Sequence, residues 1–170
     1  MASKTVIVEG SHRYQGHTGL LADYLASKLP AAHVVSLLDY DIGHYTYDHR
    51  YRNDDFLSLL RELSEYDTIV AATPIYWYAM SGRMKVFFDR ITDSMQIDKP
   101  LGRSLAGKGL AAFSCGSEDT LPQGFFEPFR LTAGYLDMQY LGNCHTWMED
   151  GIVNSQSSAR LTSLASQLTA

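Results

Sequence analysis

Residues 10–19 (GSHRYQGHTG) combine the small, hydroxyl-bearing and basic side chains that bind phosphate groups. Glycine lets a backbone approach an anion closely, and the hydroxyls of Ser11 and Thr18 can donate hydrogen bonds to it. Arg13 or His17 could add a charge-assisted bond. The segment matches neither the Walker loop nor the dinucleotide motif Gly-x-Gly-x-x-Gly, so a phosphate monoester fits it better than a triphosphate or a pyrophosphate. A well-capped turn without a ligand is the alternative that these residues leave open.

A second candidate is the aromatic segment at residues 73–82 (TPIYWYAMSG), which directly follows an apolar run. A planar ligand could stack on Tyr76 or Trp77 while backbone N–H groups bind its polar edge. We expect Pro74 to stiffen the turn and to end the hydrogen-bonding ladder of the preceding strand. A subunit contact or a small local core would use the same aromatic residues, and this segment alone does not decide between the interpretations.

Residues 114–119 (SCGSED) form a third candidate, because their small side chains would let a flat ring lie against the backbone. Cys115 is expected to be a small buried side chain rather than a nucleophile, since no histidine stands near it in the sequence. The two cysteines, Cys115 and Cys144, predict neither a disulfide framework nor a metal site. His44 and His49 lack a third ligand nearby, so we expect both to be exposed to solvent rather than bound to metal.

The elements that must position these segments alternate between strands and helices. Apolar runs predict strands at residues 5–8, 34–38, 68–72, 108–114 and 138–147. Apolar residues at helical spacing predict helices at residues 16–29, 56–63, 82–91, 125–136 and 157–168. Three of the strands are apolar throughout, which is typical of parallel strands covered by helices on both faces. The predicted fold is therefore α/β, a three-layer α/β/α sandwich in which a five-stranded parallel sheet has the order 2-1-3-4-5.

This order places a candidate site at one edge of the sheet. In an open α/β sheet, ligands bind beyond the carboxyl ends of the strands, where the strand order reverses. That point lies between the first and third strands, with the fourth beside it. The three candidate segments follow these three strands, so we expect them to form one socket.

Composition limits the class of protein. The 170 residues fit a single domain, 1–170, with a sizeable core. A net charge of −5 argues against a general nucleic-acid binder, which needs a basic face. We find no signal-peptide pattern and no apolar stretch long enough to span a membrane, so no membrane partner is expected. Together with the two cysteines, this indicates a cytoplasmic protein.

The longer run at residues 73–90 (TPIYWYAMSGRMKVFFDR) resembles a motif of the flavodoxin-like NAD(P)H-dependent oxidoreductases, also called NADPH-dependent FMN reductases. That family carries Pro-x-Tyr-Trp, followed by Ser-Gly-x-Met/Leu-Lys and then Asp-Arg. Residues 10–18 are similar to the family's loop for the FMN phosphate. The resemblance extends to about Trp147 and implies a flavodoxin-like fold, bound FMN as the cofactor, and NADPH or NADH as a transient electron donor.

The resemblance also implies the cofactor-binding residues. Ser11, Arg13, Gly16, His17 and Thr18 would hold the phosphate; Pro74, Ile75, Tyr76 and Trp77 would line the isoalloxazine, largely through backbone; Ser114, Cys115 and Gly116 would face its other edge. Lys85, Asp89 and Arg90 look structural in the family. His145 is expected to be a hydrogen-bonded residue near a strand end. No side chain is predicted to be catalytic, because the flavin carries the redox chemistry itself.

The predicted function is an FMN-dependent oxidoreductase that passes electrons from NAD(P)H to a quinone, a flavin or another small aromatic acceptor. One alternative is a flavodoxin-type electron carrier without nicotinamide activity, and another is a non-redox binding module on the same fold. The family commonly forms dimers, so a homodimer is expected. We expect Phe87 and Phe88, with the aromatic loop after the second strand, to form an apolar surface patch.

Overall fold

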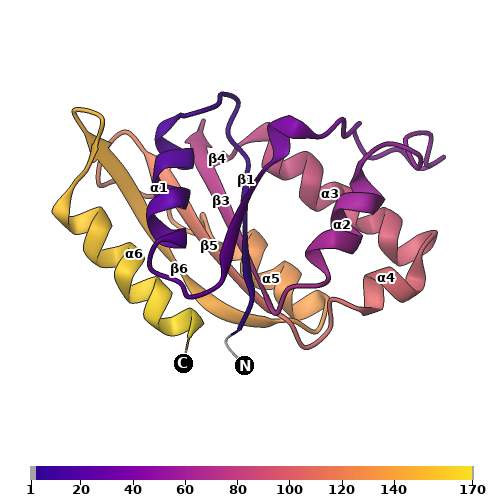
Figure 1. The fold of residues 1–170 in the computed structure, drawn as a ribbon. Coiled ribbons are helices and arrows are strands. Elements are labelled where there is room, and N and C mark those ends of the chain that lie inside the picture. The colour runs from indigo at the N-terminus through magenta and orange to yellow at the C-terminus, as the bar shows by residue number, and fades with distance from the viewer. Residues whose placement is uncertain (1–2, 170) are drawn as a thin grey trace.

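The computed structural model describes residues 3–169, which form a mixed sheet with helices on both faces (Figure 1). The strands are β1 (Thr5–Glu9), β2 (Ala32–Ser36), β3 (Thr68–Tyr76), β4 (Ala79–Met80), β5 (Gly109–Gly116), β6 (Gln139–Glu149) and β7 (Ile152–Val153). The helices are α1 (His17–Ala26), α2 (Phe56–Leu63), α3 (Gly82–Gln96), α4 (Lys99–Arg103), α5 (Glu127–Tyr135) and α6 (Ser155–Leu168), with a 3-10 turn at Leu37–Asp39. No helix among these residues has the length and apolar character that crossing a membrane requires.

The predicted sheet is confirmed and has two additions. β2, β1, β3, β5 and β6 lie in that order and pair in parallel, which is the predicted order 2-1-3-4-5. Two strands of two residues each, β4 and β7, pair antiparallel with β3 and β6. Neither of these strands nor α4 was predicted, because elements this short carry no periodic pattern.

Two apolar cores explain why the central strands are apolar throughout. Along β1, Val6 and Val8 belong to the core under α2, α3 and α5, whereas Ile7 belongs to the core under α1 and α6. Successive strand side chains point to opposite faces, so a strand covered on both faces needs apolar residues at every position. Figure 1 shows the same arrangement, with α1 and α6 on one side of the sheet and the remaining helices on the other.

The prediction that Pro74 ends the β3 ladder is wrong. β3 continues to Tyr76, and Pro74 stays in register with Cys115 of β5. β1 ends at Glu9, so beyond that point β3 is an edge strand on the β1 side. Proline is tolerated at an edge, because no partner there requires its missing N–H group.

Two further predictions fail, one for Phe87 and one for His49, because these side chains turn inward. Phe87 is buried and packs edge-on against the ring of Phe56, with the ring centroids 5.7 Å apart, and Phe88 packs in the same way against Phe129. Phe87 therefore belongs to the core, whereas Phe88 is half-buried and lines an open groove together with Leu131 and Tyr135 of α5. His49 is not exposed as predicted, because its Nδ1 atom lies 2.6 Å from a carboxylate oxygen of Asp93.

Candidate functional site

The three candidate segments meet at the carboxyl ends of β1, β3 and β5. They surround an open cavity of about 530 Å³. Ten of the twelve predicted site residues line it, all except Trp77 and Ser114, and Ser117 and Met148 join them. The lining residues are Ser11, Arg13, Gly16, His17, Thr18, Pro74, Ile75, Tyr76, Cys115, Gly116, Ser117 and Met148.

One end of this cavity is the start of α1. Gly16 occupies the N-cap position in an extended conformation and provides no side-chain cap. The first intrahelical hydrogen bond runs from the Leu20 amide to the Gly16 carbonyl, so the preceding amides of the first turn have no acceptor within the helix. Such amides, with the partial positive charge of the helix terminus, form a binding site for an anion.

Ser11 shapes the loop that leads into α1. Its Oγ atom accepts a hydrogen bond from the Arg13 amide at 3.1 Å and donates its only proton to the Arg13 carbonyl at 3.0 Å. The hydroxyl is therefore engaged inside the loop and does not donate into the cavity. Gly16 suits this position, since a Cβ atom there would lie 3.1 Å from the Arg13 side chain and would make that side chain shift.

Glu9 lies beneath this loop and was missed by the sequence analysis. It is 4% exposed, and its carboxylate accepts hydrogen bonds from the Ser11 amide at 2.9 Å and the Ser36 hydroxyl at 3.1 Å. Burial raises the pKa of Glu9 above its usual 4.5, against the opposing effects of these hydrogen bonds and of the Arg83 charge. The only available signal was a charged residue ending an otherwise apolar strand.

The hairpin between β3 and β4 borders the cavity through Tyr76. Tyr76 pairs with Ala79, so the turn consists of two residues, Trp77 and Tyr78, with φ angles of 48° and 67°. A turn with two positive φ values normally uses Asn-Gly, because other side chains are strained there. Trp77 is 92% exposed and Tyr78 is 74% exposed. The chain thus holds two large aromatic side chains in water on a strained turn, which points to a function for them.

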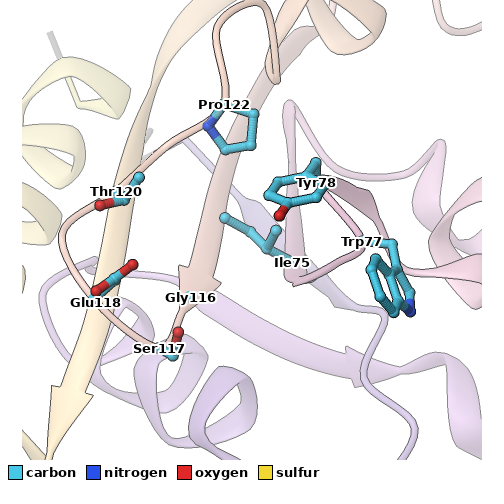
Figure 2. A pocket seen from close by; sticks show the side chains of 8 residues that line it. All are labelled: Ile75, Trp77, Tyr78, Gly116, Ser117, Glu118, Thr120 and Pro122. Carbon is cyan, nitrogen blue, oxygen red and sulfur yellow. The ribbon is translucent and has the colours of Figure 1, made fainter.

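Trp77 and Tyr78 border a second cavity of about 400 Å³, which adjoins the first (Figure 2). Both cavities share Ile75, Gly116 and Ser117 as lining residues. In Figure 2 the hairpin residues face the loop at residues 116–122 across this space. Trp77, predicted to line the cofactor cavity, therefore lies in the adjoining one.

Ser114 lies behind the wall rather than in either cavity. It is fully buried, and its Oγ atom is 2.9 Å from Nδ1 of His145. His145 is itself buried and lies 2.8 Å, through Nε2, from the Glu118 carbonyl oxygen, which confirms its prediction as a hydrogen-bonded residue near a strand end. The Ser114 hydroxyl points toward β6, and the expected contact of this residue with a ligand edge stays a prediction.

Cys115 lines the first cavity as a neutral thiol. Burial raises its pKa to about 11, against small opposing effects of the Thr18 hydroxyl and the Arg13 charge. A thiol with such a pKa is not a nucleophile near neutral pH. Among residues 3–169, no group of three His, Cys, Asp or Glu side chains is arranged to hold a metal ion.

The geometry fits a planar aromatic molecule that carries a phosphate monoester. The uncapped start of α1 could bind the phosphate, and Arg13 and His17 add basic groups beside it. Pro74, Ile75 and Gly116, whose side chains are apolar or absent, line the cavity beyond it. A Cβ atom on Gly116 would lie 2.8 Å from His145, so only glycine lets this wall close against β6.

Comparison with solved structures shows the fold. The chain superimposes on the Trp repressor binding protein from Bacillus subtilis with a TM-score of 0.74 and 19% identity, covering 95% of this chain and 96% of that one. It superimposes on oxidised flavodoxin 1 from Bacillus cereus with a TM-score of 0.64 and 15% identity, covering 98% and 97% of the two chains. The fold is therefore flavodoxin-like.

Sequence comparison shows the family. A curated relative from Bacillus subtilis, named as an NAD(P)H-dependent FMN-containing oxidoreductase, YwqN, is 30% identical over 99 residues. This match covers 55% of the chain and only about half, 54%, of the relative. The family model for NADPH-dependent FMN reductases matches residues 3–150, most of the sequence. The chain therefore belongs to the NADPH-dependent FMN reductase family, whose cofactor is FMN.

Proposed function

We propose that this chain is a single FMN-binding domain, residues 1–170, that passes two electrons from NADPH or NADH to a small aromatic acceptor. The observation that supports this most strongly is the meeting of an uncapped helix start and an aromatic hairpin in one cavity. With a quinone as acceptor, a hydride from NAD(P)H and one proton from water yield the hydroquinone and NAD(P)⁺. Bound FMN supplies the redox chemistry when present.

The role of the chain's own residues would be to bind FMN and to orient it. The first-turn amides of α1, with Thr18, Arg13 and His17, would hold the phosphate of FMN. Residues 74–77 would line one side of the ring, largely through backbone, and residues 115–116 the other. Ser11 would act by shaping the phosphate loop and Ser114 by fixing His145, since their hydroxyls are engaged within the protein.

The second cavity is proposed as the place where the acceptor enters. Trp77, Tyr78 and Pro122 give it apolar, largely flat surfaces, and it adjoins the proposed ring site. Flat aromatic acceptors such as quinones or free flavins suit these walls better than aliphatic or highly charged ones.

We also propose a cytoplasmic homodimer. Both cysteines are free thiols, which suits a reducing compartment. Exposed apolar side chains such as Leu131 and Tyr135 of α5 would be covered in a dimer. Light scattering at micromolar concentration tests this, and a monomer would refute it.

The function is tested by comparing FMN with riboflavin, which lacks the phosphate. FMN should raise the melting temperature of the wild-type protein and lose fluorescence on binding. Thr18→Ala should weaken the binding of FMN and leave the weaker binding of riboflavin unchanged, while Thr162→Ala on α6 serves as the matched control. The FMN-loaded protein should oxidise NADPH or NADH when a quinone is added.

Three outcomes would contradict this proposal. Absence of any FMN binding would remove the flavin function. FMN binding without reduction by either nicotinamide nucleotide would favour an electron carrier. Equal effects of Thr18→Ala on FMN and riboflavin would place the phosphate elsewhere.

A further inference from the structure

The loop at residues 116–122 is the common wall of the two cavities. Gly116 and Ser117 face both, and Glu118, Thr120 and Pro122 face the second. Residues 117–120 belong to no helix or strand and are exposed. The position of this wall therefore depends on whatever ties the loop to the rest of the protein.

Two polar contacts, here called ties, hold this loop, one from β6 and one from α6. Nε2 of His145 lies 2.8 Å from the Glu118 carbonyl oxygen. The guanidinium of Arg160 binds both carboxylate oxygens of Asp119, at 2.7 and 3.0 Å. The first tie is partly buried and holds the backbone, whereas the second is exposed and holds a side chain. The first should therefore contribute more to holding the wall.

The imidazole of His145 is fixed by both of its nitrogens. The Glu118 carbonyl can only accept, so Nε2 carries a proton and donates it. Nδ1 faces the buried hydroxyl of Ser114 at 2.9 Å. Because Ser114 lies near the end of β5, the strand that leads into the loop, His145 joins the base of the loop to Glu118 within it.

A stack of side chains supports this imidazole. The ring of Trp147 lies nearly parallel to that of His145, with centroids 6.1 Å apart. The Arg160 guanidinium lies 5.0 Å from the centre of the Trp147 ring and donates a hydrogen bond to the His145 carbonyl. The two ties therefore form one unit, and motion of either would disturb the other.

We propose that His145 is a positioning residue that sets the location of loop 116–122 and so controls how tightly both cavities hold their ligands. The role of His145 in holding the loop follows from the contacts within the protein alone. The effect on flavin and acceptor rests on the proposed function. His145 touches neither proposed ligand, so it acts through Glu118 and Gly116 and not in the chemistry.

The test compares His145→Phe, which keeps a ring against Trp147 but removes both hydrogen bonds, with His145→Gln, whose amide can still donate to the Glu118 carbonyl. Hydrogen exchange of the cofactor-free protein should speed up at residues 117–121 in His145→Phe. In the FMN-loaded enzyme the acceptor KM should rise about tenfold, the size expected from one lost buried hydrogen bond, with a smaller change in kcat. His145→Gln should lie between His145→Phe and wild type, and His33→Gln on β2 should match wild type.

Unchanged hydrogen exchange in the loop of a folded His145→Phe protein would overturn the proposal. A fall in kcat without a rise in KM would overturn it as well, because that result assigns His145 to the chemistry. If His145→Phe does not fold, Asp119→Ala removes the exposed tie to Arg160 and should give the same changes at smaller size. If the wild-type protein binds no FMN, the proposed function fails, while the exchange measurement still decides the role of His145 in holding the loop.

Discussion

Nη1 of Arg90 lies 2.6 Å from Oδ2 of Asp54, and both side chains lie in the interior beside α3. The same guanidinium binds the Asp93 carboxylate at 2.6 Å through Nε. It also donates to the carbonyl oxygens of Gly43 and Tyr51, which belong to the long connection between β2 and α2. Arg90 therefore holds an irregular segment against the helix, and this confirms its prediction as a structural residue.

Replacing Arg90 by Met should destabilise the protein by about 3–5 kcal/mol, because it removes the guanidinium that pairs with both the Asp54 and the Asp93 carboxylates. Urea unfolding monitored by circular dichroism measures this. Arg50→Met is the matched control, since Arg50 pairs with Asp48 on the surface and its loss should change the stability little. Equal stability of the two variants would contradict the structural role of Arg90.

The ion pair also predicts loss of stability in acid. Burial by itself would raise the pKa of Asp54, but hydrogen bonds from Arg90 and from two backbone amides outweigh it and hold the pKa below the usual 3.8. A carboxyl with a lowered folded pKa contributes stability above 3.8 that is lost as the pH falls through the folded value. Asp54→Asn should therefore be less stable than wild type at neutral pH, and the difference should shrink below pH 3.8. A constant difference across that range would contradict the assignment.

The raised pKa of Glu9 predicts the opposite dependence of stability on pH. Its pKa is raised by burial, so the folded protein binds this proton more tightly than the unfolded chain does. Stability therefore falls as the pH rises from 4.5 through the folded pKa. Glu9→Gln keeps an acceptor for the Ser11 amide and should melt at a higher temperature than wild type at neutral pH, but not below pH 4.5.

Calorimetric scans across this range measure the effect. A Glu9→Gln protein that is less stable at neutral pH would mean that attraction between Glu9 and Arg83 outweighs the cost of burial. Removal of the charge should also strengthen FMN binding several-fold, because the carboxylate lies beneath the proposed phosphate site.

The strained hairpin predicts that residues better suited to the turn would make the protein more stable but impair its function. Replacing Trp77 by Asn and Tyr78 by Gly gives the turn its preferred residues and should stabilise the protein by about 1 kcal/mol. The same change removes two walls of the second cavity and should raise the acceptor KM. Tyr47→Asn, at an exposed tyrosine with ordinary backbone, should change neither quantity. A double variant that is no more stable, or that keeps its KM, would refute the argument.

The two thiols should resist alkylation in the native protein. Burial raises the pKa of Cys115 to about 11 and that of Cys144 to about 12. Well under about 1% of either is thiolate at pH 8, so iodoacetamide should react slowly with the folded chain and rapidly after unfolding in urea. Mass spectrometry of peptides reports each site separately. Rapid native labelling of Cys115 would show that its surroundings open in solution.

The strand order and the place of the site followed from the sequence by itself. Apolar runs such as residues 5–8 are local signals, and parallel strands bring their following segments to one edge whatever the details of packing. The motif at residues 73–90 added the family and the cofactor. These features could be predicted because each depends only on neighbouring residues or on topology.

Only the tertiary structure decided where individual side chains point. The hydroxyl of Ser114 faces His145, 31 residues away, and His49 turns to Asp93 from a distant loop. Phe87 enters the core because α3 lies against α2. Each outcome depends on hydrogen-bond and packing partners that are remote in the sequence and are chosen only when the elements assemble, so no local pattern could have shown them.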